Sequence, residues 1–238
     1  MGQRRGGAVL IRAVGETGST NDDLAALARA GAPEGSWLRA DLQTGGKGRQ
    51  GRAWASPPGN LHASTLVRLR PGDPPAPSLA LVAAVALHEA VMAFGPDSPV
   101  QIKWPNDLIA GGAKLAGILL EREGEAVIAG FGVNLAHHPA DTPRPATSLA
   151  ALAGAAPEPP AFLDALADAF ARWLARWRGE GIAPIRAAWL AAAHSIGSAL
   201  STSEGEGLFE GLDETGALRL RLADGTRRVI HAGDVFLI

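Results

Sequence analysis

The pattern of the chain changes after Ser195, and this change constrains the fold more than any other sequence feature. Short strand-like runs follow one another closely after this residue. Closely spaced short strands are typical of a small β-barrel, and a segment this short needs a larger domain to pack against. We therefore predict two domains, residues 1–193 and residues 194–238. Five strand-like runs, separated by turns that carry Gly or Asp, make up the second domain: Ile196–Leu200, Gly207–Leu212, Leu218–Leu222, Arg227–His231 and Val235–Ile238.

Before this point, strand-like and helix-like patterns follow one another along the chain, which predicts a larger domain that contains both helices and strands. The alternation in Asn60–Arg70 predicts a strand with one buried face. Ser78 is a predicted helix cap, and Ser19 or Thr20 is the predicted cap of the first helix. Pro105 must end the strand that begins at Val100. The other predicted strands are Ala8–Val14, Ser36–Gln43, Leu108–Ala110, Ala113–Glu121 and Ala126–Leu135, and the predicted helices are Leu24–Ala30, Ser78–Phe94, Ala161–Arg178 and Pro184–Ala193.

A loop rich in glycine and basic residues follows one of these strands and spans Gln43–Trp54; it is called the basic loop below. It carries Lys47, Arg49 and Arg52 among four glycines. Glycine lets the backbone approach a ligand closely, and successive backbone N–H groups can form a concave anion-binding surface. The composition fits a phosphate- or carboxylate-binding loop, and it equally fits a mobile, solvated loop.

Lysine is used very selectively. The chain has only three lysines among its 22 basic residues, namely Lys47, Lys103 and Lys114. All three lie in segments that other features also single out, which favours sites that need a compact ammonium group. Lys103 and Lys114 are expected to share a polar cleft with Asp107, which is predicted to lie with Asn106 in a turn at a strand end, and with Asn134, at the end of another predicted strand.

Composition excludes several classes of function. The net charge is −2 over 238 residues, so no overall basic surface for nucleic acid or membranes is expected. The absence of cysteine excludes disulfides, cysteine-ligated zinc and a thioester intermediate. No apolar run is long enough for a transmembrane helix and the N-terminus does not resemble a signal peptide, so a cytoplasmic location is expected.

Taken together, the motifs resemble those of the biotin–protein ligase family. The resemblance covers nearly the whole chain and implies an α+β fold, in which a mixed-sheet, class II synthetase-like catalytic domain is followed by an SH3-like barrel. One departure is Lys47, where the family usually has arginine, so that the planar fork is lost. The matching segments are Gly18-Ser-Thr-Asn21, Gly46-Lys-Gly-Arg-Gln-Gly-Arg-Ala-Trp54, Lys103-Trp-Pro-Asn-Asp107, Lys114-Leu-Ala-Gly-Ile-Leu119, Gly130-Phe-Gly-Val-Asn134 and the final Gly-Asp-Val-Phe-Leu.

The resemblance implies an ATP-dependent ligase that forms biotinyl-5′-AMP and then biotinylates a lysine of a biotin carboxyl carrier protein. Because the first predicted strand begins near Ala8, we expect the type without an N-terminal DNA-binding domain. ATP and biotin would be the substrates, with Mg²⁺, and the family often forms homodimers. Two alternatives remain open, a lipoate–protein ligase and a non-catalytic sensor of biotin or nucleotide.

The same resemblance implies roles for individual residues. Lys114 and Arg49 would be catalytic, and Asp107 would either orient a lysine or hold Mg²⁺. Residues expected to bind biotin are Ser19, Thr20, Asn21, Gln43, Gly46, Lys47, Gly48, Arg49, Lys114 and Gly117. Those expected to bind ATP are Lys47, Arg49, Arg52, Trp54, Lys103, Asn106, Asp107, Lys114 and Asn134.

Overall fold

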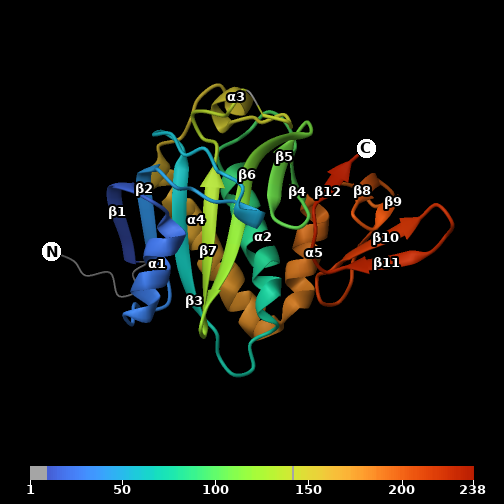
Figure 1. The fold of residues 1–238 in the computed structure, drawn as a ribbon, viewed down its shortest axis with the longest axis horizontal. Coiled ribbons are helices and arrows are strands. Elements are labelled where there is room, and N and C mark those ends of the chain that lie inside the picture. The colour runs from blue at the N-terminus through green and yellow to red at the C-terminus, as the bar shows by residue number, and fades with distance from the viewer. Residues whose placement is uncertain (1–9, 141) are drawn as a thin grey trace.

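The computed structural model describes residues 10–140 and 142–238. A seven-stranded sheet forms its centre, in the order β1-β2-β3-β7-β6-β5-β4 (Figure 1). Only β1 and β2 pair in parallel, so the sheet is mixed, as predicted. Its strands are β1 (Leu10–Thr17), β2 (Ser36–Gln43), β3 (Leu61–Arg68), β4 (Val100–Lys103), β5 (Asp107–Ala110), β6 (Ala113–Glu123) and β7 (Ala126–Val133). Of the predicted strand Ala8–Val14, Ala8 and Val9 lie outside the described residues.

Helices cover both faces of this sheet. Helix α1 (Thr20–Arg29) packs on one face, where Leu38 and Leu66 point toward it. Trp37 and Val67, the neighbours of those leucines, point to the other face, against α2 (Leu79–Met92) and α4 (Pro159–Glu180). Helix α5 (Ile182–Ala192) packs beside α2, and the short α3 (Leu149–Ala153) follows the connection after β7. None of the described helices is both long and apolar enough to cross a membrane.

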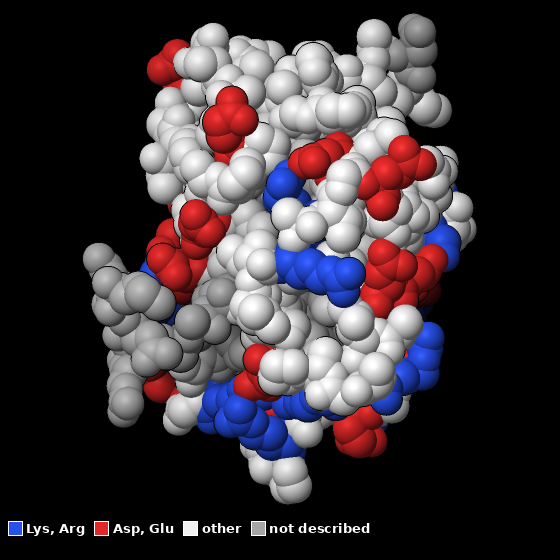
Figure 2. Space-filling model, turned by 90° about the vertical axis from the view of Figure 1, so that its left-hand side faces the viewer, with Lys and Arg blue, Asp and Glu red and all other residues white. Residues whose placement is uncertain are grey.

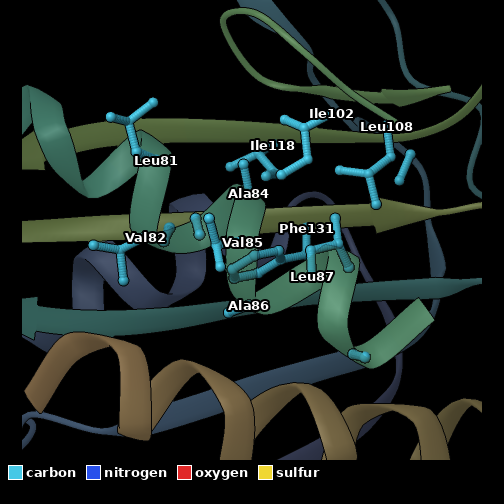
Figure 3. Close-up of a cluster of buried hydrophobic side chains, with 14 of the residues drawn as sticks. Leu81, Val82, Ala84, Val85, Ala86, Leu87, Ile102, Leu108, Ile118 and Phe131 are labelled. Atoms are coloured by element: carbon cyan, nitrogen blue, oxygen red, sulfur yellow. The ribbon is translucent and has the colours of Figure 1, made fainter. Parts of the chain in front are cut away.

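Helix α2 packs against β4, β5 and β6 of the sheet and against α4 and α5, so it is buried around most of its circumference. Figure 3 shows Val85 of this helix beside Phe131 of the sheet, and Ala84 beside Ile118. A helix that is apolar all round is expected in such a position, because it has no face left for solvent. This packing makes the sheet a rigid support for the loops at its edge.

Strand β3 corrects one expectation. The alternation predicted a single buried face, but every residue from Leu61 to Val67 is buried. The polar positions His62 and Ser64 are 1% and 0% exposed because α1 and the segment around Pro57 cover them. The polar side of β3 therefore faces a covered polar site instead of solvent.

Ser78 corrects a second expectation. It adopts helical backbone angles and its side chain makes no capping hydrogen bond to α2. Instead its Oγ donates to the carbonyl of Pro75 at 2.6 Å and accepts from Nε1 of Trp177 at 2.8 Å. Ser78 thus ties α2 to α4, while the predicted cap of α1 is confirmed at Ser19, whose Oγ accepts from the N–H of Asp22.

The C-terminal segment forms a separate antiparallel sheet, in the order β11-β10-β9-β8-β12. Trp104, at the end of β4, donates its indole N–H to the carbonyl of Gly216 at 3.2 Å, which helps to dock this sheet on α2, α5 and β4. The predicted α+β fold class is confirmed, and we propose a domain boundary near residue 194. The strands are β8 (Ala199–Thr202), β9 (Gly205–Leu212), β10 (Leu218–Leu222), β11 (Arg227–Ile230) and β12 (Val235–Leu237).

A charged cluster joins α4 to two loops. Arg178 donates to both carboxylate oxygens of Glu34, at 2.7 Å each, and also contacts Asp73 at 3.2 Å. Burial raises the pKa of Glu34, but the hydrogen bonds from Arg178 and from the N–H of Arg68 outweigh this effect and lower it. The folded state therefore stabilises the charged form of Glu34.

We expect Glu34→Gln to reduce stability at pH 7 by about 1–2 kcal/mol, since the cluster is partly exposed. A lowered pKa contributes stability above the unfolded-state value and loses it as the pH falls through the folded-state value. The difference in unfolding free energy from wild type should therefore be full above about pH 5 and should shrink as the pH falls from there to about pH 3. Urea unfolding at both pH values measures it. Glu214→Gln, at an exposed turn, is the matched control; an equal deficit at both pH values would contradict the assignment.

Candidate active site

A cavity of about 450 Å³ lies where the basic loop, the start of α1 and the hairpin of β5 and β6 meet. The structure brings together almost every site residue predicted from the sequence. Only Gly46 does not line the cavity; its carbonyl accepts from the N–H of Trp54 at 2.9 Å and so closes the basic loop on itself. The lining includes Ser19, Thr20, Asn21, Gln43, Lys47, Gly48, Arg49, Arg52, Trp54, Lys103, Asn106, Asp107, Lys114, Gly117 and Asn134.

A hydrogen-bond network forms one wall of this cavity. Oε1 of Gln43 accepts from the N–H and the hydroxyl of Thr20 at 2.8 and 3.0 Å. The Thr20 hydroxyl also lies 2.7 Å from that of Ser64, which donates to Oδ1 of Asn21 at 2.6 Å. Nδ2 of Asn21 in turn donates to Glu121 at 2.6 Å. These bonds fix the orientation of the side chains, so their remaining donors and acceptors are presented to a ligand in a set geometry.

Two glycines of the sheet allow side chains to lie directly on its surface. A Cβ at Gly132 would lie 2.5 Å from the indole of Trp54, and one at Gly130 would lie 2.2 Å from Oδ1 of Asn21. A Cβ at Gly117 would contact both Trp54 and Lys114 at 3.2–3.3 Å. The close approach at Gly117 is made by side chains of the cavity itself.

We expect Gly132→Ala to displace Trp54 and loosen the basic loop. An overlap of this kind typically costs about 1–3 kcal/mol, which corresponds to about a 10- to 100-fold fall in any activity that needs the closed loop. Trypsin cleavage after Arg49 and Arg52 should become faster. Gly15→Ala is the matched control, because a Cβ at Gly15 would meet no atom within 4 Å. Unchanged proteolysis in the Gly132 variant would contradict this packing role.

Asp107 lies between two lysines of the cavity, Lys103 and Lys114. One carboxylate oxygen is 2.7 Å from Nζ of Lys114 and the other is 3.3 Å from Nζ of Lys103. Burial lowers the pKa of Lys103, and Asp107 opposes this effect by favouring the charged form. Nζ of Lys114 also lies 5.3 Å from the centre of the Trp54 ring. Asp107 is the first residue of β5, whereas the sequence placed it in the preceding turn with Asn106.

The same carboxylate is a poor candidate for holding a metal ion alone. Both of its oxygens face lysine ammonium groups, and no cluster of three His, Cys, Asp or Glu side chains suited to a metal occurs within residues 10–140 and 142–238. Mg²⁺ in nucleotide enzymes usually binds through one or two carboxylates together with substrate phosphates. The geometry favours the first alternative for Asp107, orientation of the lysines.

The basic loop is held at both ends by ion pairs. Lys47 contacts Asp22 on α1 at 2.6 Å, a bond that raises the pKa of Lys47. Arg52 and Arg49 contact Asp234, just before β12, at 3.1 and 3.5 Å. Burial raises the pKa of Asp234, but the two arginines outweigh it and lower that pKa. The loop is therefore attached to α1 on one side and to the C-terminal sheet on the other, unlike a free solvated loop.

Asn134 lines the cavity while its side chain supports the next segment. Its Nδ2 donates to the carbonyl of Thr147 at 3.0 Å. The N–H of Thr147 donates to the carbonyl of Lys114 at 2.9 Å, and the N–H of Lys114 donates to Pro145 at 2.8 Å. The connection between β7 and α3 is thus fixed along the strand that carries Lys114.

Several residues of the site were not assigned from the sequence. Ser64 and Glu121 belong to strands whose patterns indicate only burial, and Asp234 lies in the last strand motif, which was noted without a role. A buried hydroxyl on the polar side of β3 was the one available signal for Ser64. The face drawn in Figure 2 carries acidic and basic side chains interspersed, in agreement with the net charge of −2.

Comparison with known proteins identifies the family. Residues 17–135 match the Biotin/lipoate A/B protein ligase family, and residues 202–238 match the biotin protein ligase C-terminal domain. A biotin–[acetyl-CoA-carboxylase] ligase of Paracoccus denitrificans is 44% identical over 92% of this chain and 97% of its own length. The corresponding ligase of Mycobacterium tuberculosis is 34% identical over 93% of this chain and 86% of its own.

A solved structure agrees on the fold. The biotin protein ligase from Aquifex aeolicus, in complex with biotin and ATP, superimposes with a TM-score of 0.85 over 96% of this chain and 99% of that one, at 24% identity. The resemblance inferred from the motifs is therefore confirmed. Family models match both segments of the chain, and the chain covers almost the whole length of the Paracoccus ligase. The chain therefore belongs to the biotin/lipoate A/B protein ligase family.

Proposed function

We propose that this protein is a biotin–[acetyl-CoA-carboxylase] ligase, which activates biotin with ATP as biotinyl-5′-AMP and transfers the biotinyl group to a lysine of a carrier protein. The observation that carries the proposal is the position of Lys114. Lys114 lines the cavity together with Thr20 and Gln43 of the polar wall and with the arginines of the basic loop, and Asp107 contacts its ammonium group at 2.7 Å. Names of the similar proteins support the same activity.

In the first half-reaction a carboxylate oxygen of biotin attacks the α-phosphorus of ATP, and the bond to the β-phosphate oxygen breaks to release pyrophosphate. Two anions must approach each other, so the protein contributes mainly positioning and positive charge. Lys114, oriented by Asp107, would bind the biotin carboxylate and the α-phosphate. Arg49 and Lys47 would close over the adenylate, and Arg52 would contact the phosphates of ATP. Mg²⁺ would enter with ATP and neutralise phosphate charge.

In the second half-reaction the uncharged amine of a carrier lysine attacks the acyl carbonyl, the bond to the phosphate oxygen breaks, and AMP leaves. Closure of the basic loop would exclude water from the reactive anhydride between the two steps. No nucleophile of the protein is required, which suits a chain without cysteine.

The polar wall favours biotin over lipoate as the substrate. The ureido group of biotin carries two N–H donors and a carbonyl acceptor, which fit the hydroxyls of Ser19 and Thr20 and the amide of Gln43. The dithiolane ring of lipoate offers no comparable groups. A site built from hydrogen-bonding side chains discriminates strongly against a ligand that leaves them unpaired.

Pyrophosphate release with ATP and Mg²⁺ tests the proposal, with biotin, lipoate and octanoate compared as acids. Release with biotin alone is expected. Release with lipoate alone would retain the chemistry and overturn the assigned substrate. No release with any acid would favour the non-catalytic sensor, which equilibrium binding of biotin would then detect.

The cellular setting follows from this activity. We propose a cytoplasmic location and a carrier protein as the macromolecular partner, without nucleic acid or membrane. A homodimer stays a prediction from the family resemblance, and analytical ultracentrifugation with and without biotin and ATP measures it.

A further inference from the structure

Arg144 lies on the rim of the cavity, in the connection between β7 and α3. The carbon of its guanidinium group is 3.7 Å from the centre of the Phe236 ring, which belongs to β12 of the C-terminal sheet. Nζ of Lys103 lies 5.8 Å from the same ring. The C-terminal sheet thus supplies an aromatic face that holds a cation at the mouth of the cavity.

The backbone beside Arg144 is fixed relative to Lys114. The carbonyl of Pro145, the next residue, accepts from the N–H of Lys114 at 2.8 Å, and Ala146 pairs with Lys114 as an isolated parallel bridge. The hydroxyl of Thr142 donates to the carbonyl of Arg144 at 2.6 Å. Hydrogen bonds on both sides therefore set the distance between Arg144 and the proposed reacting centre.

Arg144 also differs from the other cations of the cavity in its electrostatic partner. Lys47 pairs with Asp22, and Lys103 and Lys114 pair with Asp107. Arg49 and Arg52 pair with Asp234. Within the described parts of the chain, no carboxylate lies within 4.0 Å of the Arg144 guanidinium nitrogens, although Arg144 helps Arg52 and Arg49 to lower the pKa of Asp234. Stacking on Phe236 uses the face of the guanidinium group and leaves its N–H edge available for a planar or tetrahedral anion.

We propose that Arg144 binds the β- and γ-phosphates of ATP and holds the pyrophosphate as it leaves, with Phe236 as its positioning residue. This inference rests on the proposed function. Negative charge develops on the leaving group when the bond at the α-phosphorus breaks, and a fixed arginine at the open side of the cavity stabilises it. Lys114 and Arg49 are assigned to the α-phosphate and the acyl group, and Arg52 contacts the phosphates from the basic loop; Arg144 adds a second guanidinium group from the connection between β7 and α3.

An acidic surface of the carrier protein is the other anion that an exposed arginine could recognise. The nucleotide is the better fit because Arg144 lines the cavity and is held by the strand segment that also fixes Lys114. The two half-reactions separate these occupants, since ATP takes part only in the first and the carrier only in the second.

The test compares the half-reactions of wild type and Arg144→Ala. For pyrophosphate release, kcat/KM for ATP should fall about 10- to 100-fold, the range for loss of a hydrogen bond between charged groups. The KM for biotin, and transfer from preformed biotinyl-AMP to the carrier, should stay at wild-type values. Arg144→Lys keeps the positive charge and loses the planar fork, so its kcat/KM for ATP should lie between those of wild type and Arg144→Ala. Arg122→Ala, an exposed arginine at the far end of β6, is the matched control.

The Phe236 variants test the positioning role. Phe236→Tyr keeps the aromatic face and should behave as wild type, whereas Phe236→Leu should raise the KM for ATP with little change in kcat. Normal ATP kinetics in Arg144→Ala would overturn the proposal, as would a defect confined to transfer, which would assign Arg144 to the carrier. If wild type itself releases no pyrophosphate with biotin, the proposed function fails, and this outcome is distinct from a failure of Arg144.

Discussion

Lys114→Ala should lower biotin-dependent pyrophosphate release by about 10³-fold or more while the protein remains folded. Removal of a single fixed donor to a developing charge commonly lowers kcat by about 10²–10³-fold. Lys114 would act on both the attacking carboxylate and the phosphate. The 2.7 Å contact with Asp107 holds its ammonium group in place before substrates bind. Initial rates of pyrophosphate release at saturating ATP and biotin measure the effect.

The fold should tolerate this substitution because the side chain of Lys114 is 37% exposed and its structural contacts are made by the backbone. The melting temperature should therefore change little. Lys114→Arg tests whether charge alone is sufficient, and it should stay strongly impaired because the longer, planar group cannot occupy the space between Asp107 and Trp54. Wild-type turnover by Lys114→Ala would remove Lys114 from the mechanism and leave Lys103 as the lysine to test.

The sequence was sufficient to predict the parts of the site that are local in the chain. The basic loop, the start of α1 and the three lysines could be selected because glycine, capping residues and rare lysines stand out from their neighbours. The contacts of Asp234 could not be derived in this way. Its partner Arg52 is 182 residues earlier in the chain, and a single Asp in a turn carries no pattern that reveals such a contact.

Strand β3 shows a second limit of sequence patterns. Alternation reports which side chains are apolar, and solvent is the usual reason for polar ones to face away from the core. In β3 the polar side chains face away from the core because they belong to the site, with Ser64 bonded to both Thr20 and Asn21. A buried polar network and a solvated strand face therefore give the same pattern, and only the position of α1 distinguishes them.

Arg49→Gly should release more free biotinyl-AMP, which is the second of the two largest effects. Arg49 connects the basic loop to two other segments, with Nη1 at 3.0 Å from the carbonyl of Gly233 and 3.4 Å from Oδ1 of Asn106. Without these bonds the loop loses contacts on the open side of the cavity, while Lys114 and the polar wall keep theirs. Adenylate formation should persist, and the adenylate should escape about 10- to 100-fold more often per turnover.

Gln50→Gly is the matched control for this variant. Gln50 is exposed, neighbours Arg49 and has a φ of 59°, so glycine at this position adds the same backbone freedom without removing a guanidinium group. Adenylate separated by filtration from a reaction without carrier protein gives the readout. If both variants release adenylate equally, flexibility of the basic loop controls retention and Arg49 has no role as a clamp. If only Arg49→Gly does so, the three-way contact with the C-terminal sheet and the β4–β5 turn keeps the intermediate in place.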